Sequence, residues 1–218
     1  MFTHVIFDLD GTLLDTLADL AAACNWVCRQ HGWPEHPVEE YKTFVGNGAP
    51  KLLERVAPQG TALTDALRAQ ALEEFTRRYN AHKEDRTRVY GGMPQALERM
   101  KGAGLTLAVL SNKPHAAAVP VVERYYPGVF AAVQGALPGL PVKPDPALLS
   151  RLMADIGAPR ESTLFVGDSN VDIRTAKNGG LPGCGVLWGF RTREELEAEG
   201  ADFIVQAPAE LAGLVLGR

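Results

Sequence analysis

The stretch that decides the fold is VIFDLDGTLLDT, residues Val5–Thr16. Its first residues, from Val5 to Phe7, form an apolar run without alternation, which is typical of a parallel strand buried on both faces. Asp8 and Asp10 stand two residues apart, so on extended backbone their side chains leave the same side of the chain. Open α/β sheets bind ligands at the carboxyl ends of their strands. The stretch therefore predicts such a sheet, with two carboxylates at its ligand-binding edge.

Two carboxylates so close together repel each other, and the pKa of one rises unless the pair shares a cation or a proton. Asp8 and Asp10 therefore indicate a divalent metal. An aspartate can also act as a nucleophile that forms an aspartyl-phosphate, while a neighbouring carboxyl group gives a proton to the leaving alkoxide. A bare Asp-x-Asp-Gly is also typical of a polar turn, and on these residues alone the turn is the favoured interpretation.

The whole string from Asp8 to Thr16 behind an apolar strand closely resembles the first motif of the haloacid dehalogenase (HAD) superfamily of aspartate-nucleophile phosphohydrolases. The resemblance implies that Asp8 attacks phosphorus and that Asp10 is the acid/base. It further implies that Mg²⁺ is held by the Asp8 carboxylate and the Asp10 carbonyl oxygen, and that Gly11 and Thr12 belong to the phosphate-binding turn.

The bulk composition indicates a soluble globular protein. The 218 residues are 46% hydrophobic and 22% charged, and they suffice for a large core with a smaller insert. The net charge is −4 and no Lys/Arg cluster stands out, so nothing supports a nucleic-acid partner. The first residues match neither a signal peptide nor a membrane span, and we expect a cytoplasmic protein without membrane contact. Cys24, Cys28 and Cys184 are expected in the core rather than as metal ligands.

A block of helices is expected between two parts of the α/β pattern. Thr16-x-x-Asp19 resembles a capping box and predicts a helix from Leu17 to about His31, with Asp15 and Asp19 serving the helix start. No convincing strand follows until about residue 86, which predicts an inserted helical bundle. In the family this is the cap domain that closes over the active site. We therefore predict a core domain of residues 1–14 and 87–218 and a helical cap of residues 15–86.

Within the predicted cap, one glycine-rich loop could bind an anion. Gly46, Asn47 and Gly48 precede a predicted helix whose free N–H groups would attract negative charge, and Lys51 and Arg55 would add to the attraction. A plain loop between cap helices fits these residues equally well. The loop also resembles the cap of phosphoglycolate phosphatases, which implies recognition of a small carboxylate substrate.

Two further strand ends carry polar residues that suit a phosphoryl group. Ser111 and Asn112 follow a second apolar run and could donate hydrogen bonds to phosphate oxygens, with Lys113 beside them. Their position matches the second motif of the family, and Asn112-Lys113-Pro114 is the form found in its phosphoglycolate phosphatase-like members. Lys143, in Lys-Pro-x-Pro, resembles the third motif and is expected to balance the charge of the carboxylates and the phosphoryl group.

The last expected strand, from Leu164 to Gly167, is followed by a fourth group of polar residues. Asp168 is expected to ligate the metal directly, since Mg²⁺ needs only one or two carboxylates besides water. Asp172 is expected to hold a metal-bound water or to orient Lys143, with Ser169 in support. The alternative is that Asp168 caps the following helix. Nothing catalytic is expected from Gly185–Gly189.

These features predict an α/β protein with a doubly wound, Rossmann-like parallel sheet and an inserted helical cap. The resemblance implies a Mg²⁺-dependent phosphomonoester hydrolase with an aspartyl-phosphate intermediate, acting on 2-phosphoglycolate, as a monomer or homodimer. Alternatives are another small phosphometabolite as substrate (a sugar phosphate, a nucleotide or pyrophosphate), a sugar phosphomutase, or a non-catalytic phosphate-binding module. The presence of Asp10 argues against a dehalogenase or phosphonate hydrolase, and the intact Asp8 and Asp10 argue against a non-catalytic module.

Overall fold

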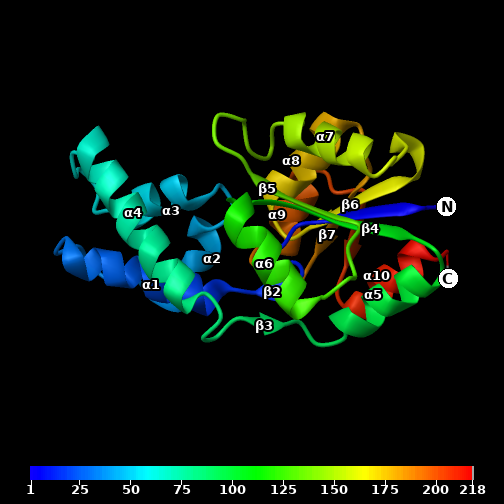
Figure 1. Ribbon diagram of the computed structural model, residues 1–218, viewed down its shortest axis with the longest axis horizontal. Coiled ribbons are helices and arrows are strands. Elements are labelled where there is room, and N and C mark those ends of the chain that lie inside the picture. The colour runs from blue at the N-terminus through cyan, green and yellow to red at the C-terminus, as the bar shows by residue number, and fades with distance from the viewer. Residues whose placement is uncertain (218) are drawn as a thin grey trace. The chain divides into compact units, whose positions relative to one another are not determined.

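The computed structural model describes residues 1–217, which divide into two compact units (Figure 1). The core unit consists of Met1–Leu14 and of the chain from Val89 onward. The helical unit consists of Asp15–Arg88. At the boundary between the units, the short strands β2 (Leu14–Asp15) and β3 (Arg88–Val89) form a two-stranded sheet.

The core unit contains a parallel sheet with the strand order β5-β4-β1-β6-β7-β8. Its strands are β1 (His4–Phe7), β4 (Thr106–Pro114), β5 (Ala132–Ala136), β6 (Thr163–Gly167), β7 (Gly183–Val186) and β8 (Phe203–Val205). The helices of this unit are α5 (Met93–Gly102), α6 (His115–Tyr125), α7 (Ala147–Asp155), α8 (Asn170–Gly179), α9 (Arg193–Ala198) and α10 (Pro208–Val215), with a 3₁₀ turn η2 (Arg160–Ser162). The predicted α/β class with a doubly wound parallel sheet is confirmed.

The chain reverses its direction across the sheet next to β1. From β1 it proceeds through β4 to β5, and it then crosses to β6 on the other side of β1 and continues to β7 and β8. Ligands of open α/β sheets bind where the strand order reverses in this way, at the carboxyl ends of the strands. The residues that follow β1 and β6 are therefore the ones that the fold brings to the binding position.

Both faces of the sheet are buried, which explains the unbroken apolar runs of its strands. Val5 and Phe7 of β1 belong to a core cluster with residues of α5, α6 and α10 on one face. Ile6, between them, belongs to a second cluster with residues of α7 and α8 on the other face. Figure 1 shows these two sets of helices on opposite sides of the strands. This packing fixes β1, and with it the position of Asp8.

The helical unit contains α1 (Leu17–Gln30), η1 (Val38–Glu40), α2 (Tyr41–Phe44), α3 (Ala49–Val56) and α4 (Asp65–His82). The expected helix after Thr16 is present, but the expected capping box is wrong. Thr16 accepts no capping hydrogen bond, and its buried hydroxyl oxygen has no hydrogen-bond partner among the described residues. Asp15 caps instead, with Oδ1 accepting from the Leu17 N–H at 3.3 Å.

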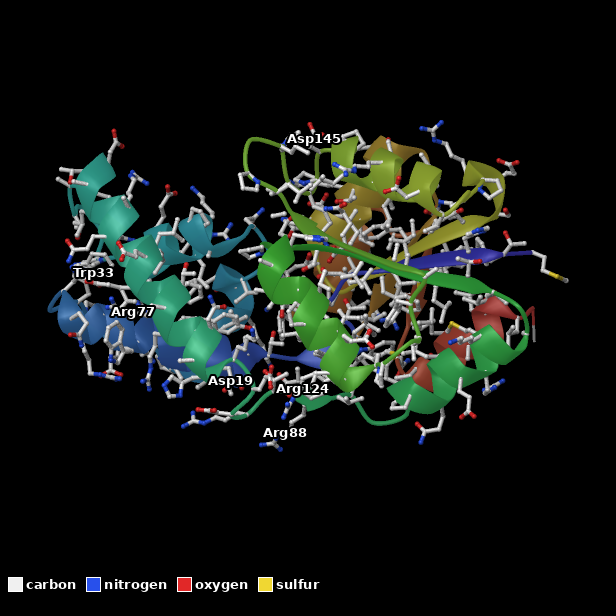
Figure 2. The ribbon with its side chains drawn as sticks, viewed as in Figure 1. Asp19, Trp33, Arg77, Arg88, Arg124 and Asp145 are labelled. Carbon is white, nitrogen blue, oxygen red and sulfur yellow. The ribbon has the colours of Figure 1, made fainter. Side chains whose placement is uncertain are left out.

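Asp19, the other expected member of that box, serves a different contact. Its carboxylate accepts hydrogen bonds from the backbone N–H groups of Arg86 and Thr87 and from the Thr87 hydroxyl at 2.8–3.1 Å. Figure 2 labels Asp19 near the start of α1. Asp19 thus ties the first turn of α1 to the segment that leads the chain out of the helical unit.

Candidate active site

Three buried carboxylates meet at the carboxyl ends of β1 and β6. Asp8 follows β1, Asp168 follows β6, and Asp172 lies in the first turn of α8. Each can offer one oxygen such that the three atoms lie within 4.8 Å of one another. The sheet pairing explains this convergence, because β1 and β6 are adjacent and parallel, with Phe7 opposite Val166.

A buried lysine joins two of these carboxylates. Lys143 Nζ lies 2.8 Å from Asp8 Oδ1 and 2.7 Å from Asp172 Oδ1, and the lysine side chain is 3% exposed. Asn112 holds the lysine backbone, because its amide accepts from the Lys143 N–H at 2.8 Å and donates to the Lys143 carbonyl at 3.0 Å. The expected contact between Asp172 and Lys143 is therefore present.

Asp172 owes its orientation to the start of α8. Ser169, not Asp168, is the N-cap residue, and its N–H and hydroxyl both donate to Asp172 Oδ2, at 3.0 and 2.6 Å. This capping box occupies one carboxylate oxygen and leaves the other to Lys143. The alternative that Asp168 caps this helix is thereby excluded.

Asp168 is held by the turn that follows β1 and by the chain after β7. The Thr12 hydroxyl donates to Asp168 Oδ1, and the Phe190 N–H donates to Oδ2, both at 2.9 Å. Gly11, at φ 96°, allows the close approach, because a Cβ there would lie 2.4 Å from Asp168 Oδ2. The Thr12 side chain therefore contacts the expected metal ligand.

Asp10 pairs with a different lysine. Lys113 Nζ lies 2.9 and 3.1 Å from the two carboxylate oxygens of Asp10, and the lysine side chain is 3% exposed. Ser111 accepts a hydrogen bond from the Lys113 N–H through its hydroxyl oxygen at 3.2 Å. A hydroxyl group that accepts one bond still carries a proton that it can donate to a ligand.

The electrostatics of the cluster favour a bound cation. Burial raises the pKa of Asp8 to about 8, with Asp172 and Asp168 adding to the shift and Lys143 opposing it. Burial and the charge of Asp172 raise the pKa of Asp168 to about 7. Burial alone would lower the pKa of Lys143, but the Asp172 and Asp8 carboxylates outweigh it and raise that pKa, so the lysine stays charged. The cluster therefore holds three carboxyl groups and one ammonium group, which contacts two of them.

The donor set fits a hard divalent cation. Carboxylate oxygens are the ligands that such ions prefer, and the three aspartates can converge on one point. The cation would favour the ionised carboxylates that burial disfavours. Asp8 and Asp168 are the ligands expected from the sequence. Asp172, which was expected to hold a metal-bound water or to orient Lys143, also lies within this cluster of carboxylates.

Asn112, expected to bind phosphate, contacts the Lys143 backbone, and its role toward phosphate stays a prediction. Both ends of its amide are engaged with the Lys143 backbone, so it positions the lysine. The sequence shows that Asn112 follows an apolar run, but it does not show which later segment returns to that strand end.

The loop expected to bind an anion lies in the helical unit. Gly46, Asn47 and Gly48 lead into α3, with Gly48 at its N-cap. Arg55 donates to the Phe44 carbonyl at 2.6 Å and to Asn47 Oδ1 at 2.8 Å. Within this unit Arg55 thus stabilises the loop of residues 45–48 through two hydrogen bonds.

Lys51, also expected at this anion site, pairs with Glu54 at 2.7 Å, and its side chain is 54% exposed. Glu54 also pairs with Arg68, so Lys51 shares this carboxylate with a second cation.

The chain after β7 supplies contacts that the sequence did not indicate. The Phe190 N–H donates to Asp168, and the Trp188 indole N–H donates to the Thr12 carbonyl at 2.9 Å. Backbone donors and a lone indole leave no recognisable motif. The only available signal was that Trp188 and Phe190 follow another strand of the same parallel sheet, and so reach the same edge.

The chain matches the family model described as "Haloacid dehalogenase-like hydrolase" over residues 5–186. It is 35% identical to a phosphoglycolate phosphatase of Vibrio vulnificus strain YJ016, over 97% of this chain and 95% of that protein. A phosphoglycolate phosphatase of Pseudomonas syringae is 34% identical, over 92% and 75% of the two chains. The crystal structure of a proposed phosphoglycolate phosphatase from Lactobacillus delbrueckii subsp. bulgaricus matches with a TM-score of 0.92 and 32% identity, over 100% and 99%.

The chain therefore belongs to the haloacid dehalogenase-like hydrolases. Within that family it is a phosphatase, of the type to which these relatives belong. The family and class expected from the sequence are confirmed. Among the described residues, no helix is long and apolar enough to span a membrane.

Proposed function

We propose that this protein hydrolyses phosphomonoesters through a phosphorylated Asp8. The observation that carries the proposal is the ion pair between Asp8 and Lys143 at the switch point of the sheet, with Asp168 and Asp172 around it. Lys143 orients the Asp8 carboxylate and opposes the rise of its pKa on burial, which favours the charged form that a nucleophile needs. The same ammonium group can offset the charge on the phosphoryl oxygens during transfer.

Two residues would bracket the reacting phosphoryl group. Asp8 attacks phosphorus, the bond to the alkoxide oxygen breaks, and Asp10 gives that oxygen its proton. Asp10 then takes a proton from the water that attacks the phosphorus of phospho-Asp8, which restores the free Asp8 carboxylate and releases phosphate. Ser111, through its hydroxyl proton, would bind a phosphoryl oxygen.

We assign Mg²⁺ as the cation, held by Asp8, Asp168 and the Asp10 carbonyl oxygen. When bound, it would neutralise charge on the phosphoryl group and lower the pKa of the carboxyl groups around it. Thr12 and the β6–α8 capping box orient the aspartates for this purpose. We further propose a cytoplasmic location, which agrees with three buried, unpaired cysteines.

The proposed substrate is 2-phosphoglycolate, on the strength of relatives about 35% identical that carry the name phosphoglycolate phosphatase. In this substrate a carboxylate lies one carbon away from the leaving oxygen. Lys113 stands beside Asp10, on the side of the proposed acid, where it can bind that carboxylate. We therefore assign Lys113 to the substrate rather than to the phosphoryl group.

Substitution Lys113→Met should penalise a substrate that carries a carboxylate more than one that lacks it. A charge-assisted hydrogen bond is worth about 1.5–3 kcal/mol, so kcat/KM for 2-phosphoglycolate should fall about 10- to 100-fold. For ethyl phosphate the loss should be smaller by at least a factor of about five. Equal losses for both substrates would contradict the assignment.

The function is tested by measuring phosphate release from 2-phosphoglycolate, sugar phosphates, nucleotides and pyrophosphate, with Mg²⁺ or EDTA and with Asp8→Asn as control. The proposal requires that 2-phosphoglycolate leads in kcat/KM by about tenfold, which is 1.4 kcal/mol of discrimination. If another ester leads, the mechanism stands and the substrate is wrong. If wild type and Asp8→Asn release phosphate equally, the mechanism is wrong.

A further inference from the structure

The segment Leu187–Phe190, here called the β7 loop, touches the candidate metal site from a direction that none of the family motifs covers. It begins where β7 ends, and its first residue still pairs with β8 through the Leu187 N–H and the Val205 carbonyl at 3.0 Å. The loop is thus anchored to the sheet. Its next three residues, Trp188, Gly189 and Phe190, each meet the turn after β1 or the carboxylate after β6.

The β7 loop and Thr12 together orient Asp168 through one hydrogen bond to each of its oxygens. Phe190 N–H donates to Oδ2 and the Thr12 hydroxyl donates to Oδ1, both at 2.9 Å. A carboxylate has about four lone-pair positions, so each oxygen keeps one for a cation. Two such bonds from opposite oxygens fix the rotation of the carboxylate, which a single bond would leave free.

Trp188 adds a link between the loop and Thr12. Its indole N–H donates to the Thr12 carbonyl at 2.9 Å, and the hydroxyl of the same threonine donates to Asp168. A shift of the loop would therefore reach Asp168 by two routes. One route is the direct bond from Phe190, and the other passes through Thr12.

Gly189 shows how tightly the loop is packed against the site. A Cβ at this position would lie 2.2 Å from Asp168 Cβ and 2.6 Å from the Gly11 carbonyl oxygen. Both neighbours belong to the candidate metal site or to the turn that builds it, and one is backbone. Any side chain here must displace Asp168, the turn or the loop.

We propose that the β7 loop is a positioning element that sets the divalent-cation affinity of the site by holding Asp168 in its ligating orientation. The inference rests on the proposed function only in that Asp168 is a metal ligand. Hydrogen bonds to ligating carboxylates change metal affinity by about 10- to 100-fold when they are lost. In this proposal the loop itself contributes no ligand to the cation.

The test measures Mn²⁺ binding to the whole protein by electron paramagnetic resonance of the free ion, with Mg²⁺ as competitor. Gly189→Ala should weaken Mn²⁺ binding at least tenfold. Trp188→Phe, which keeps an aromatic ring but removes the indole N–H and part of the ring, should weaken it at least threefold. Gly91→Ala is the matched control, because a Cβ at Gly91 meets nothing within 4 Å. In both loop variants, saturating Mg²⁺ should restore kcat to within about threefold of wild type, which a damaged fold would not allow.

Unchanged Mn²⁺ affinity in Gly189→Ala would overturn the inference and leave the proposed function intact. If Gly189→Ala does not fold, Trp188→Phe provides the test. A Mn²⁺ affinity of Trp188→Phe equal to that of wild type would then overturn the inference. If the wild type itself binds no Mn²⁺, or binds it as well after Asp168→Asn, the proposed metal site is wrong, and the inference fails with it.

Discussion

At the scale of single residues, Lys143 is the counter-ion of two carboxylates of the site. It is the ammonium group that bridges Asp8 and Asp172, and all three side chains are buried. Removing one partner of a buried ion pair leaves charge without compensation, which costs far more than the intact pair contributes. Lys143 therefore matters for stability as well as for catalysis.

Substitution Lys143→Met should lower the free energy of unfolding of the metal-free protein by about 3 kcal/mol, because Asp8 and Asp172 lose their counter-ion. It should also lower kcat at least about 100-fold, since the transferring oxygens lose a fixed positive charge. Urea denaturation and steady-state kinetics measure the two effects. Lys177→Met, at an exposed position of α8, removes one hydrogen bond to the Glu199 carbonyl and serves as the control, which should change stability by less than about 1.5 kcal/mol. A variant as stable as that control would refute the electrostatic role.

Single residues were also where the sequence was most informative. Asp8, Asp168 and Asp172 were expected at the site because each follows or borders a strand end, and Lys143 because its segment resembles the third motif of the family. The structure brings all four together. Asn112 was assigned to phosphate because amides bind phosphate well. In the structure it contacts the Lys143 backbone, 31 residues away, and this contact depends on how the loop after β5 returns.

At the scale of elements, the helical unit depends on a contact between the two ends of its chain. Asp19 in α1 accepts hydrogen bonds from Arg86 and Thr87, just before β3. The carboxylate is 3% exposed, so water cannot replace it as an acceptor without rearrangement. This contact closes the helical unit at the point where the chain enters and leaves it.

Substitution Asp19→Ala removes the acceptor of two backbone N–H groups, while the Thr87 hydroxyl can still donate to the Lys83 carbonyl at 2.9 Å. Each buried, unsatisfied group costs about 1–3 kcal/mol, and some of them will reach water, so we expect a loss of about 2–4 kcal/mol in the free energy of unfolding. Chemical denaturation followed by circular dichroism gives the value. The same change at exposed Asp85, which pairs with His82 on the surface of this unit, should cost under about 0.5 kcal/mol. Equal effects at the two positions would contradict the role of Asp19.

Elements show most clearly where sequence patterns mislead. Thr16-x-x-Asp19 has the spacing of a capping box and predicts the start of α1 correctly, yet Asp15 provides the cap. Asp19 is drawn instead to donors 67 and 68 residues away. The spacing of the motif is the same whether Asp19 caps α1 or accepts hydrogen bonds from distant residues. The sequence motif alone therefore cannot show which of the two occurs.

At the scale of the whole molecule, the buried acidic cluster should link stability to pH. In the metal-free protein the pKa of Asp8 is raised from 3.8 to about 8 and that of Asp168 to about 7. The folded state thus holds these protons more tightly than the unfolded chain does. Their contribution to stability is present in full below about pH 3.8 and is lost as the pH rises through 7 and 8.

The metal-free protein should therefore have a lower Tm at pH 8.5 than at pH 5.5, and Mg²⁺ should raise Tm more at the higher pH. A cation that competes with protons binds the folded state better once the carboxyl groups are ionised. Differential scanning calorimetry with EDTA or with Mg²⁺ measures both trends. Asp8→Asn combined with Asp168→Asn should flatten the difference. A Mg²⁺ effect that is larger at pH 5.5 would contradict this account of the cluster.

The sheet could be predicted because its strands are short apolar runs that end in polar residues, as in Val5–Asp8 and Leu164–Asp168. These runs report burial on both faces, which only a parallel sheet between helices provides. The β7 loop could not be predicted as part of the site. Its contribution comes from the Phe190 backbone N–H, the Trp188 indole N–H and the absence of a side chain at Gly189, and these become visible only when Asp168 and Thr12 are placed beside them.

The central claim is that Asp8 is phosphorylated during turnover, and trapping the intermediate tests it most directly. The enzyme is mixed with substrate and Mg²⁺, quenched in acid and reduced with borohydride, which converts an aspartyl-phosphate to homoserine that peptide mass spectrometry locates. The account predicts homoserine at position 8 alone, only in the presence of substrate, and none in Asp8→Asn. Homoserine at another aspartate, or steady phosphate release with no homoserine at any position, would contradict it.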